Sequence, residues 1–234
     1  MEPSQTGAYI FEPAPTPTLA VEGTQAQFPI HRIYCVGRNF ADHAVEMGHD
    51  PNKEPPFFFQ KNPDNILPVG QEFPYPSVSK DVHHEIELVV ALHKGGSDIP
   101  AEEALGCVFG YAVGLDMTRR DLQGEAKKLG RPWETGKAFE HSAPCGALHS
   151  ASDVGHPAEG DVWLKINGEM RQSGNLNQMI WKVPEMISYL SRLFELKPGD
   201  LIFAGTPAGV GPVARGDEMH GHIAGIGEIR FKVT

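Results

Sequence analysis

Turn-forming residues divide this chain into short apolar runs, and they limit the fold to short elements. Glycine occurs 26 times and proline 20 times among the 234 residues, which is well above average usage. The runs between them are rich in β-branched and aromatic residues, as at positions 33–36, 57–59 and 108–115. We therefore expect a β-rich α+β fold, in which many short strands are separated by turns and helices are few.

Two local patterns are specific enough to place individual elements. Asn167-Gly168 lies between two alternating runs and predicts a tight hairpin, because a type I′ turn requires positive φ at both central residues. Pro184 opens an amphipathic pattern that predicts a helix over 184–194. Further strands are expected at 85–92, 201–204 and 226–233, and short helices at 41–47 and 101–105.

The first 28 residues differ from the rest of the chain in composition. They contain several prolines and few large apolar groups, so we expect an extended arm over residues 1–28, with one short strand at 9–11. Residues 29–234 are expected to form a single main domain, since a chain of this length can bury one sizeable core.

Charge and apolar content exclude several kinds of partner. The formal net charge is −10, and no cluster of Lys and Arg provides a footprint for nucleic acid. No apolar run approaches the roughly 18 residues that a membrane span needs, and residues 1–18 do not resemble an export signal. The three cysteines have no CxxC spacing, which indicates reduced thiols and a cytoplasmic protein.

Two glutamates lie on one side of the strand predicted in HHEIELVV, residues 83–90. Because side chains alternate along a strand, Ile86 and Leu88 face one way while Glu85 and Glu87 face the other, about 7 Å apart. Such a pair most often lies on a solvent-facing strand. Two carboxylates at this separation can also share a cation, which would remove their mutual repulsion.

Asp116 strengthens the second interpretation. It ends an apolar run, where a buried acid needs a partner. Glu85, Glu87 and Asp116 together form an all-oxygen ligand set suited to Mg²⁺, with Mn²⁺ or Ca²⁺ as alternatives. With a divalent ion these three acids would carry a net charge near −1. On the residues alone, a metal site and a solvated strand are equally supported.

Four blocks in order resemble the signature segments of the fumarylacetoacetate hydrolase family. They are VGRNFADH (36–43), HHEIEL (83–88), LDMTRRDLQ (115–123) and FAGTPAGVGP (203–212). Three further segments are similar to the bacterial fumarylpyruvate hydrolases within this family: FPIHRIYC (28–35), EPPFFFQK (54–61) and GRPWE (130–134). The resemblance implies a mixed β-roll with few helices, usually dimeric, so we expect a homodimer.

The resemblance also implies roles for individual residues. It makes the three acids metal ligands and His43 and Glu46 a water-activating pair; on a helical turn this spacing puts both on one face. Residues 36–38 offer no carboxylate where the eukaryotic enzyme has a further aspartate ligand, so three protein ligands are expected. The remaining implied positions are Arg120, Gln123 and Lys137 as polar catalytic residues, and Thr206, Arg38 and Lys61 as binding residues for the substrate anion.

The implied substrate is a 2,4-dioxo acid, a small-molecule 2-oxo acid that carries an acyl group. The expected reaction is hydrolysis of 3-fumarylpyruvate to fumarate and pyruvate, a step of gentisate breakdown. Alternatives within the family are an acylpyruvase or oxaloacetate decarboxylase, and the isomerase/decarboxylase of 2-hydroxyhepta-2,4-diene-1,7-dioate. A sensor that binds a keto acid without turnover is the alternative outside enzymes, although simple binding needs no His43–Glu46 pair.

Overall fold

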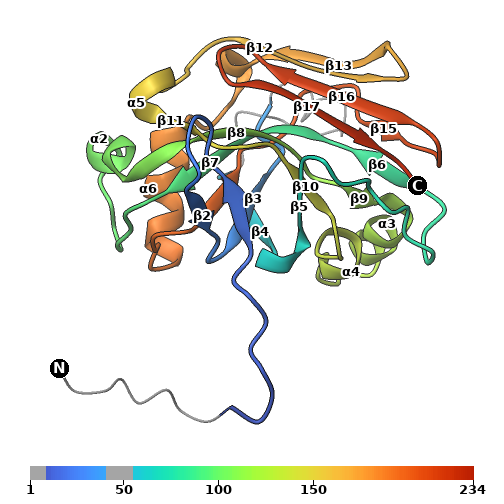
Figure 1. The fold of residues 1–234 in the computed structure, drawn as a ribbon, viewed down its shortest axis with the longest axis horizontal. Coiled ribbons are helices and arrows are strands. Elements are labelled where there is room, and N and C mark those ends of the chain that lie inside the picture. Colours follow the sequence, from blue (N-terminus) through green and yellow to red (C-terminus); the bar gives the residue numbers. More distant parts are fainter. Residues whose placement is uncertain (1–8, 41–54) are drawn as a thin grey trace.

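A mixed eight-stranded sheet forms the centre of the protein, for which the computed structural model describes residues 9–40 and 55–234 (Figure 1). Its path runs β4 (Phe57–Lys61), β3 (Ile33–Gly37), β14 (Leu201–Phe203), β7 (Ile86–Leu92), β8 (Val108–Leu115), β10 (Ala143–Cys145) and β5 (Ile66–Pro68), with β11 (His149–Ser150) paired to β8. The pairs β3–β14 and β5–β10 are parallel, and the others are antiparallel. The expected β-rich architecture is confirmed.

A four-stranded antiparallel sheet lies above the large sheet in Figure 1. Its strands, in spatial order, are β13 (Glu169–Asn175), β12 (Asp161–Ile166), β16 (Glu218–Ile223) and β17 (Gly227–Lys232). Asn167 and Gly168 join β12 to β13 with φ angles of 53° and 83°, so the predicted hairpin and its turn are confirmed. A small three-stranded sheet contains β15 (Gly211–Pro212), β6 (Val82–His84) and β9 (Thr118–Arg119).

Strand β7 is buried on both faces and separates two hydrophobic clusters. Ile86, Leu88 and Val90 pack with residues of the four-stranded sheet, whereas Val89 and Ala91 face a second cluster on the other side. The predicted alternation of side chains is therefore confirmed. No face of this strand is solvated, so Glu85 and Glu87 do not belong to an exposed strand edge.

The longest helix agrees with the sequence prediction, and three others were not foreseen: α3 (Arg120–Lys128), α4 (Glu134–Lys137) and α5 (Ala151–Val154). Helix α6 (Val183–Leu193) begins with a proline in its first turn and buries Met186, Ile187 and Leu190. Helices α3 and α4 carry few apolar residues, and their helical pattern is weak in the sequence. The short helix α2 (Ala101–Ala104) and 3₁₀ turns at Pro63–Asn65, Leu105–Cys107 and Leu176–Gln178 complete the described elements.

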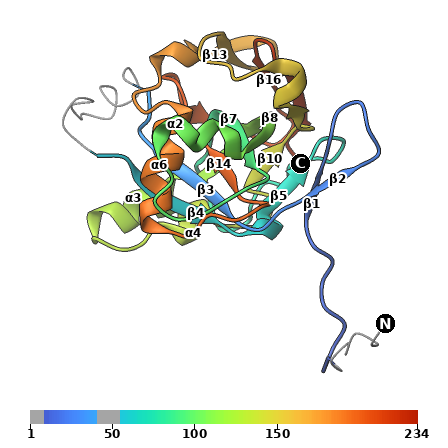
Figure 2. The same cartoon turned by 90° about the vertical axis from the view of Figure 1, so that its left-hand side faces the viewer.

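The N-terminal region contributes to the core from residue 18 onward. A hairpin of β1 (Thr18–Ala20) and β2 (Gln27–Pro29) buries Leu19 and Phe28 in the second hydrophobic cluster. Residues 9–17 extend away from the body of the protein (Figure 2). The strand expected at 9–11 is wrong, because this segment pairs with no strand of residues 9–40 and 55–234 and Ile10 is fully exposed.

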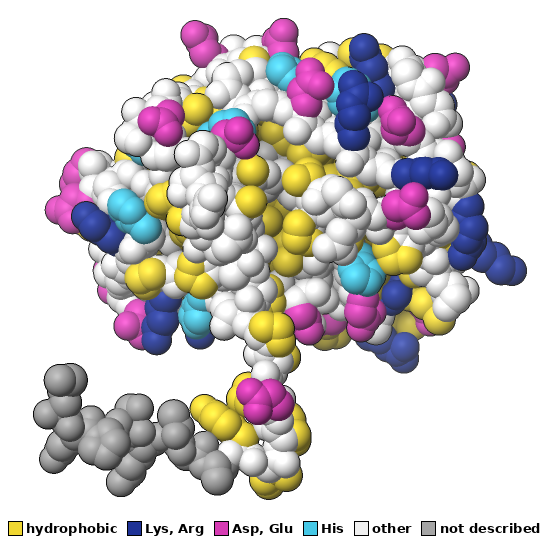
Figure 3. Space-filling view, viewed as in Figure 1, with side chains coloured by type: hydrophobic (Ala, Val, Ile, Leu, Met, Phe, Trp, Pro, Cys, Tyr) yellow, Lys and Arg dark blue, Asp and Glu magenta, His cyan; other side chains and the backbone are white. Residues whose placement is uncertain are grey.

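The face in Figure 3 carries mixed charge at its rim and apolar side chains near its centre. Acidic and basic side chains alternate around that rim rather than separating into patches.

All three cysteines are buried and unpaired. Across residues 9–40 and 55–234, no helix combines the length and apolar character needed to cross a bilayer.

Candidate metal and substrate site

Two adjacent antiparallel strands bring the three predicted ligands together. Ile86 on β7 pairs with Leu115 on β8, so Glu85 and Asp116 lie side by side where these strands end. The Asp116 amide donates to the Glu85 carbonyl at 2.8 Å and fixes this register. Glu87 follows two residues along β7 on the same side. Oxygens of all three carboxylates lie within 4.8 Å of one another, and all three residues are buried.

Lys137 at the end of α4 links two of these acids. Its Nζ donates to Glu85 Oε2 at 2.8 Å, to Asp116 Oδ2 at 2.7 Å and to the Thr118 hydroxyl at 2.6 Å. An ammonium group has three hydrogens, so these contacts occupy its whole donor capacity. Lys137 therefore holds two carboxylates in place, and in this arrangement it has no hydrogen left for a substrate.

Glu85 and Glu87 differ sharply in electrostatic environment. Burial opposes ionisation of Glu85, but Lys137 and Arg120, which also donates to Oε1, hold its pKa well below its usual range. For Glu87, burial and then the charges of Asp116 and Glu85 raise the pKa well above its usual range. The only described donor to the Glu87 carboxylate is the Gly205 amide, at 2.8 Å. Glu87 is thus the acid that most needs an added cation.

Lys61 lies behind the three acids rather than at the pocket wall. Its Nζ is 2.8 Å from Asp116 Oδ1 and donates to the carbonyl groups of Met117 and Lys137. The side chain is fully buried, and Lys61 is absent from the described residues that line the pocket. The structure therefore places this predicted substrate-binding residue beside Asp116, as a countercharge.

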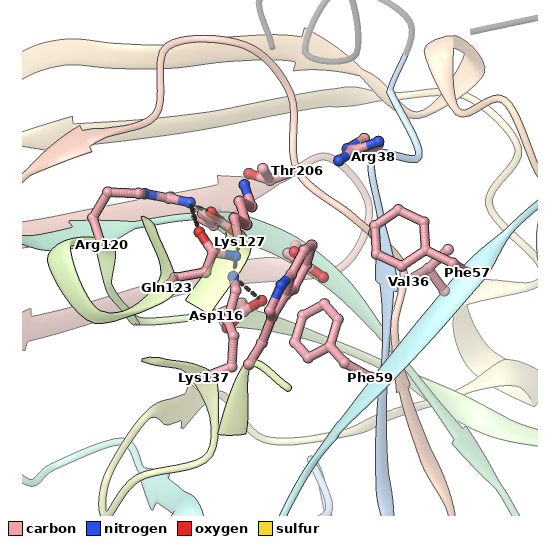
Figure 4. Close-up of a pocket in the computed structure, with 14 residues that line it drawn as sticks. Val36, Arg38, Phe57, Phe59, Asp116, Arg120, Gln123, Lys127, Lys137 and Thr206 are labelled. Atoms are coloured by element: carbon pink, nitrogen blue, oxygen red, sulfur yellow. Dashed lines mark hydrogen bonds and ion pairs between the residues drawn. The ribbon is translucent and has the colours of Figure 1, made fainter. Parts of the chain in front are cut away.

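Helix α3 presents three polar side chains to the pocket from one face. Arg120, Gln123 and Lys127 are spaced by three and four residues, so they share that face (Figure 4). Arg120 donates to Gln123 Oε1 at 2.7 Å, which leaves the Gln123 amide group without a hydrogen bond among the described residues. Arg120 is thus committed to Gln123 and Glu85, while Gln123 can donate into the pocket.

Lys127 and an aromatic wall were not identified from the sequence. Phe57, Phe59 and Trp133 line the pocket, and Trp133 lies edge-on to Phe57 with ring centroids 5.6 Å apart. The Lys127 Nζ is 5.0 Å from the Trp133 ring centre and has no hydrogen bond to the described residues. Burial, then the charges of Arg120 and Arg38, lower the pKa of Lys127 to about 8. A correct prediction of helix α3 would have identified Lys127 as a pocket residue, because it lies one helical turn beyond Gln123.

Thr206 and Arg38 also line the pocket, as expected from the signature blocks. Thr206 lies in the loop between β14 and β15, and its hydroxyl oxygen accepts a hydrogen bond from Gln172 Nε2 at 2.8 Å. Arg38 has a φ of 55°, a left-handed conformation that few residues other than glycine adopt. Its guanidinium group lies 5.2 Å from the centre of the Phe57 ring.

His43 and Glu46 lie outside the residues that the structure describes. Asn39 precedes that segment and is fully buried. Its amide donates to the Ala204 carbonyl at 2.7 Å, and its Oδ1 accepts from the Trp181 amide at 2.7 Å. The chain is therefore anchored beside the Thr206 loop just before the two predicted catalytic residues begin.

The donor set fits a divalent cation. Three buried carboxylates offer oxygen ligands only, and Glu87 has no cationic partner among the described residues. Mg²⁺, Mn²⁺ and Ca²⁺ prefer such hard ligands. The net charge of −1 inferred from the three acids omitted Lys61, Lys137 and Arg120, which balance them. A bound divalent ion would make the cluster positive, and this would favour an anionic substrate.

A family model described as "Fumarylacetoacetate (FAA) hydrolase C-terminal" matches residues 32–234. The crystal structure of fumarylpyruvate hydrolase from Pseudomonas aeruginosa in complex with Mn²⁺ and pyruvate is similar, with 54% sequence identity and a TM-score of 0.95, over 97% of this chain and 99% of that chain.

Two other relatives carry different activities in their names. "Oxaloacetate tautomerase FAHD1, mitochondrial" from Mus musculus is 44% identical over 201 residues, which are 86% of this chain and 90% of that protein. The structure of 2-hydroxyhepta-2,4-diene-1,7-dioate isomerase from Mycobacterium marinum is 29% identical with a TM-score of 0.77, over 94% of this chain and 76% of that chain. The same fold and a related sequence thus accompany hydrolases, tautomerases and isomerases.

Proposed function

This chain belongs to the fumarylacetoacetate hydrolase family, and from that premise we propose that it hydrolyses 3-fumarylpyruvate to fumarate and pyruvate. The observation that carries the proposal is the likeness, along nearly the whole chain, to the Pseudomonas fumarylpyruvate hydrolase. The pocket supports it, because buried carboxylates for a cation and free donors for an anion face the same space.

In the proposed reaction, water adds to the 4-oxo carbon and the bond between C3 and C4 breaks. The electron pair of that bond passes to C3, which gives the enolate of pyruvate, and a proton then completes pyruvate. Glu85, Glu87 and Asp116 would hold a divalent cation, which would supply Lewis-acid chemistry at the pyruvate end of the substrate. We propose Mg²⁺ as the physiological ion, although the similar Pseudomonas structure is a complex with Mn²⁺.

The side chains of the pocket divide into two groups in this proposal. Lys137 and Arg120 hold Glu85 in position, and Lys137 also holds Asp116. Gln123, Lys127 and Thr206 retain hydrogens that can be donated to the substrate and to the oxyanion formed on water addition. His43 takes the proton from the attacking water, and Glu46 orients and charges its imidazole, as the family resemblance implies.

An oxaloacetate-directed activity is the second candidate, and the mouse relative supports it. One experiment separates the candidates: the purified protein with Mg²⁺ or Mn²⁺ is given fumarylpyruvate and then oxaloacetate. We expect loss of the dienolate absorbance of fumarylpyruvate with release of one pyruvate per substrate. Enol–keto conversion or carbon dioxide release from oxaloacetate, with fumarylpyruvate untouched, would replace the proposal. No turnover of either would leave a keto-acid sensor.

We further propose that the protein acts as a cytoplasmic homodimer. The dimer follows from the family resemblance and the location from the sequence. Light scattering of the purified protein will measure its mass against 25.5 kDa for one chain.

Lys127 is expected to make ligand binding depend on pH. Its pKa is lowered to about 8, first by burial and then by Arg120 and Arg38, so its ammonium is charged below that pH and neutral above it. Binding of pyruvate in the presence of Mn²⁺ should therefore weaken several-fold between pH 7 and pH 9, since a charge-assisted hydrogen bond is lost. Isothermal titration calorimetry will measure this affinity.

Two variants of neighbouring lysines test that assignment. K127M should bind pyruvate about tenfold more weakly at pH 7, because hydrogen bonds to charged groups contribute roughly 1.5–3 kcal/mol. It should also lose the decline that wild type shows above pH 8. Lys128 is exposed on the same helix, so K128M serves as the control and should bind as wild type does. An unchanged pH profile in K127M would assign the titration to another group.

A further inference from the structure

Gln172 on β13 connects three parts of the protein next to the pocket. Its side chain is fully buried and takes part in four hydrogen bonds. Oε1 is 2.9 Å from His84 Nδ1 and 3.0 Å from the Ile86 amide, at the junction of β6 and β7. Nε2 is 2.8 Å from the Thr206 hydroxyl and 2.8 Å from the Pro207 carbonyl, in the loop between β14 and β15.

Two of these partners determine which way the amide of Gln172 points. The backbone amide of Ile86 can only donate, so the atom facing it must be the oxygen. The carbonyl of Pro207 can only accept, so the atom facing it must be the nitrogen. Both constraints give the same orientation, and rotating the amide by 180° would break both bonds. The imidazole of His84 must consequently carry its hydrogen on Nδ1.

The polarity of the Thr206 hydroxyl follows from this orientation. Because Nε2 of Gln172 can only donate, the Thr206 oxygen is the acceptor in their hydrogen bond. Thr206 has no other side-chain hydrogen bond in the described part of the chain, so its own hydrogen remains available. Thr206 lines the pocket together with the three metal-binding acids.

We propose that Gln172 is a positioning residue, which orients the Thr206 hydroxyl as a donor to the carboxylate of the bound 2-oxo acid. The identity of that ligand rests on the proposed function. A hydroxyl without this partner could turn and donate elsewhere, and it would then repel the anion with its lone pairs. Gln172 thus makes this point of the pocket favour a hydrogen-bond acceptor on the ligand, although Gln172 itself does not contact the ligand.

The packing of the Thr206 loop against β13 supports this role. A methyl group on Gly209 would lie 2.1 Å from the Arg171 carbonyl oxygen, and one on Gly174 would lie 2.7 Å from Pro207. The loop backbone therefore lies directly on the strand that carries Gln172. The Gly205 amide, next to Thr206, donates to Glu87, so the same loop also contacts the metal ligands.

Pyruvate with saturating Mn²⁺ is the probe, because its binding can be measured by calorimetry whether or not the protein hydrolyses fumarylpyruvate. T206V removes the hydroxyl and keeps the shape, and it should weaken binding about tenfold, or about 1.4 kcal/mol. Q172E keeps the acceptor for Ile86 and removes the donor to Thr206, so it should weaken binding by a similar factor. The double variant should bind no worse than T206V alone. Q60E makes the same chemical change at an exposed position and should bind as wild type does.

The combination of variants separates positioning from a general structural role. If Gln172 only supports the fold, the losses from Q172E and T206V will multiply in the double variant, and that result would overturn the proposal. Wild-type affinity in Q172E would overturn it as well. Neutron diffraction of deuterated wild-type crystals with Mn²⁺ and pyruvate needs no variant, should Q172E not fold. The deuterium on Thr206 is expected to point to the pyruvate carboxylate, and a deuterium directed at Gln172 would contradict the proposal.

Discussion

Replacing Glu87 with glutamine is expected to abolish tight metal binding without destabilising the metal-free protein. Glu87 is buried next to Asp116 and Glu85, and these charges together with burial raise its pKa well above the usual range. Its ionisation therefore costs folding free energy at neutral pH when no cation is bound. Glutamine removes that cost and can still accept the hydrogen bond from Gly205.

E87Q is expected to have opposite effects on the stability of the metal-free protein and on the binding of metal. A raised carboxyl pKa means that the stability of the metal-free wild type falls as pH rises above the ordinary pKa of glutamate. E87Q should lack this decline, so its midpoint of thermal unfolding in EDTA should equal or exceed that of wild type at pH 7. Its affinity for Mg²⁺ or Mn²⁺ should fall by at least about a hundredfold, since even changes to groups that only support the ligands cost about 10–100-fold. Calorimetry and thermal unfolding measure the two quantities.

Glu85 provides the matched control on the same strand. Its carboxylate accepts from Lys137 at 2.8 Å and from Arg120. E85Q therefore removes the carboxylate partner that Arg120 has among the described residues, and one of the two carboxylates that accept from Lys137. Breaking a buried ion pair in this way costs about 3–5 kcal/mol. E85Q should therefore lose metal affinity and also unfold at a lower temperature in EDTA. Equal destabilisation by E87Q and E85Q would show that the two carboxylates do not differ as described.

Replacing His43 with alanine is expected to remove most of the catalytic rate and to spare ligand binding. General acid–base groups contribute about 10²–10⁴-fold, so kcat should fall by that factor. The proposed metal ligands and the donors of α3 belong to other segments, so the affinities for Mn²⁺ and pyruvate should stay within a factor of about two. Steady-state kinetics with fumarylpyruvate and calorimetry with pyruvate check the two parts.

Two further variants show how a loss of activity in H43A is to be interpreted. E46Q should lower kcat less than H43A and shift the pH dependence of kcat, because the carboxylate is proposed to act through the imidazole. H49A lies in the same segment but outside the signature block, and it should retain the wild-type rate. Full activity in H43A would remove the His43–Glu46 pair from the mechanism. Loss of Mn²⁺ binding in H43A would indicate a structural role instead.

The sequence predicted the elements whose signals are local. The Asn167-Gly168 hairpin and helix α6 are where the pattern places them, because turn chemistry and helical periodicity are properties of short segments. Helix α3 was missed because its polar residues face the pocket and few apolar residues mark its buried side. The strand expected at residues 9–11 does not form, since a strand requires a neighbour and the described part of the chain places none beside this segment.

The grouping of the three acids was predictable and the positions of their countercharges were not. Glu85, Glu87 and Asp116 could be grouped because strand alternation and an acid after an apolar run are visible in the chain. Lys61 ends β4 and Lys137 ends α4, so both come from segments distant from Asp116, and only the tertiary fold brings them to it. Gln172 could not be predicted for the same reason, because it lies 34 positions before Thr206 in the sequence.

The sequence by itself thus determined the family, the β-rich architecture and the three acids that meet at the ends of β7 and β8. These follow from short-range periodicity and from the order of the signature blocks, which can be recognised without knowing how the rest of the chain folds. Only the tertiary structure decided which charges are compensated, which donors stay free and that the Thr206 hydroxyl oxygen accepts from Gln172. These properties depend on distances between atoms far apart in the chain, and because burial lowers the dielectric, a displacement of a few ångströms changes their energies substantially.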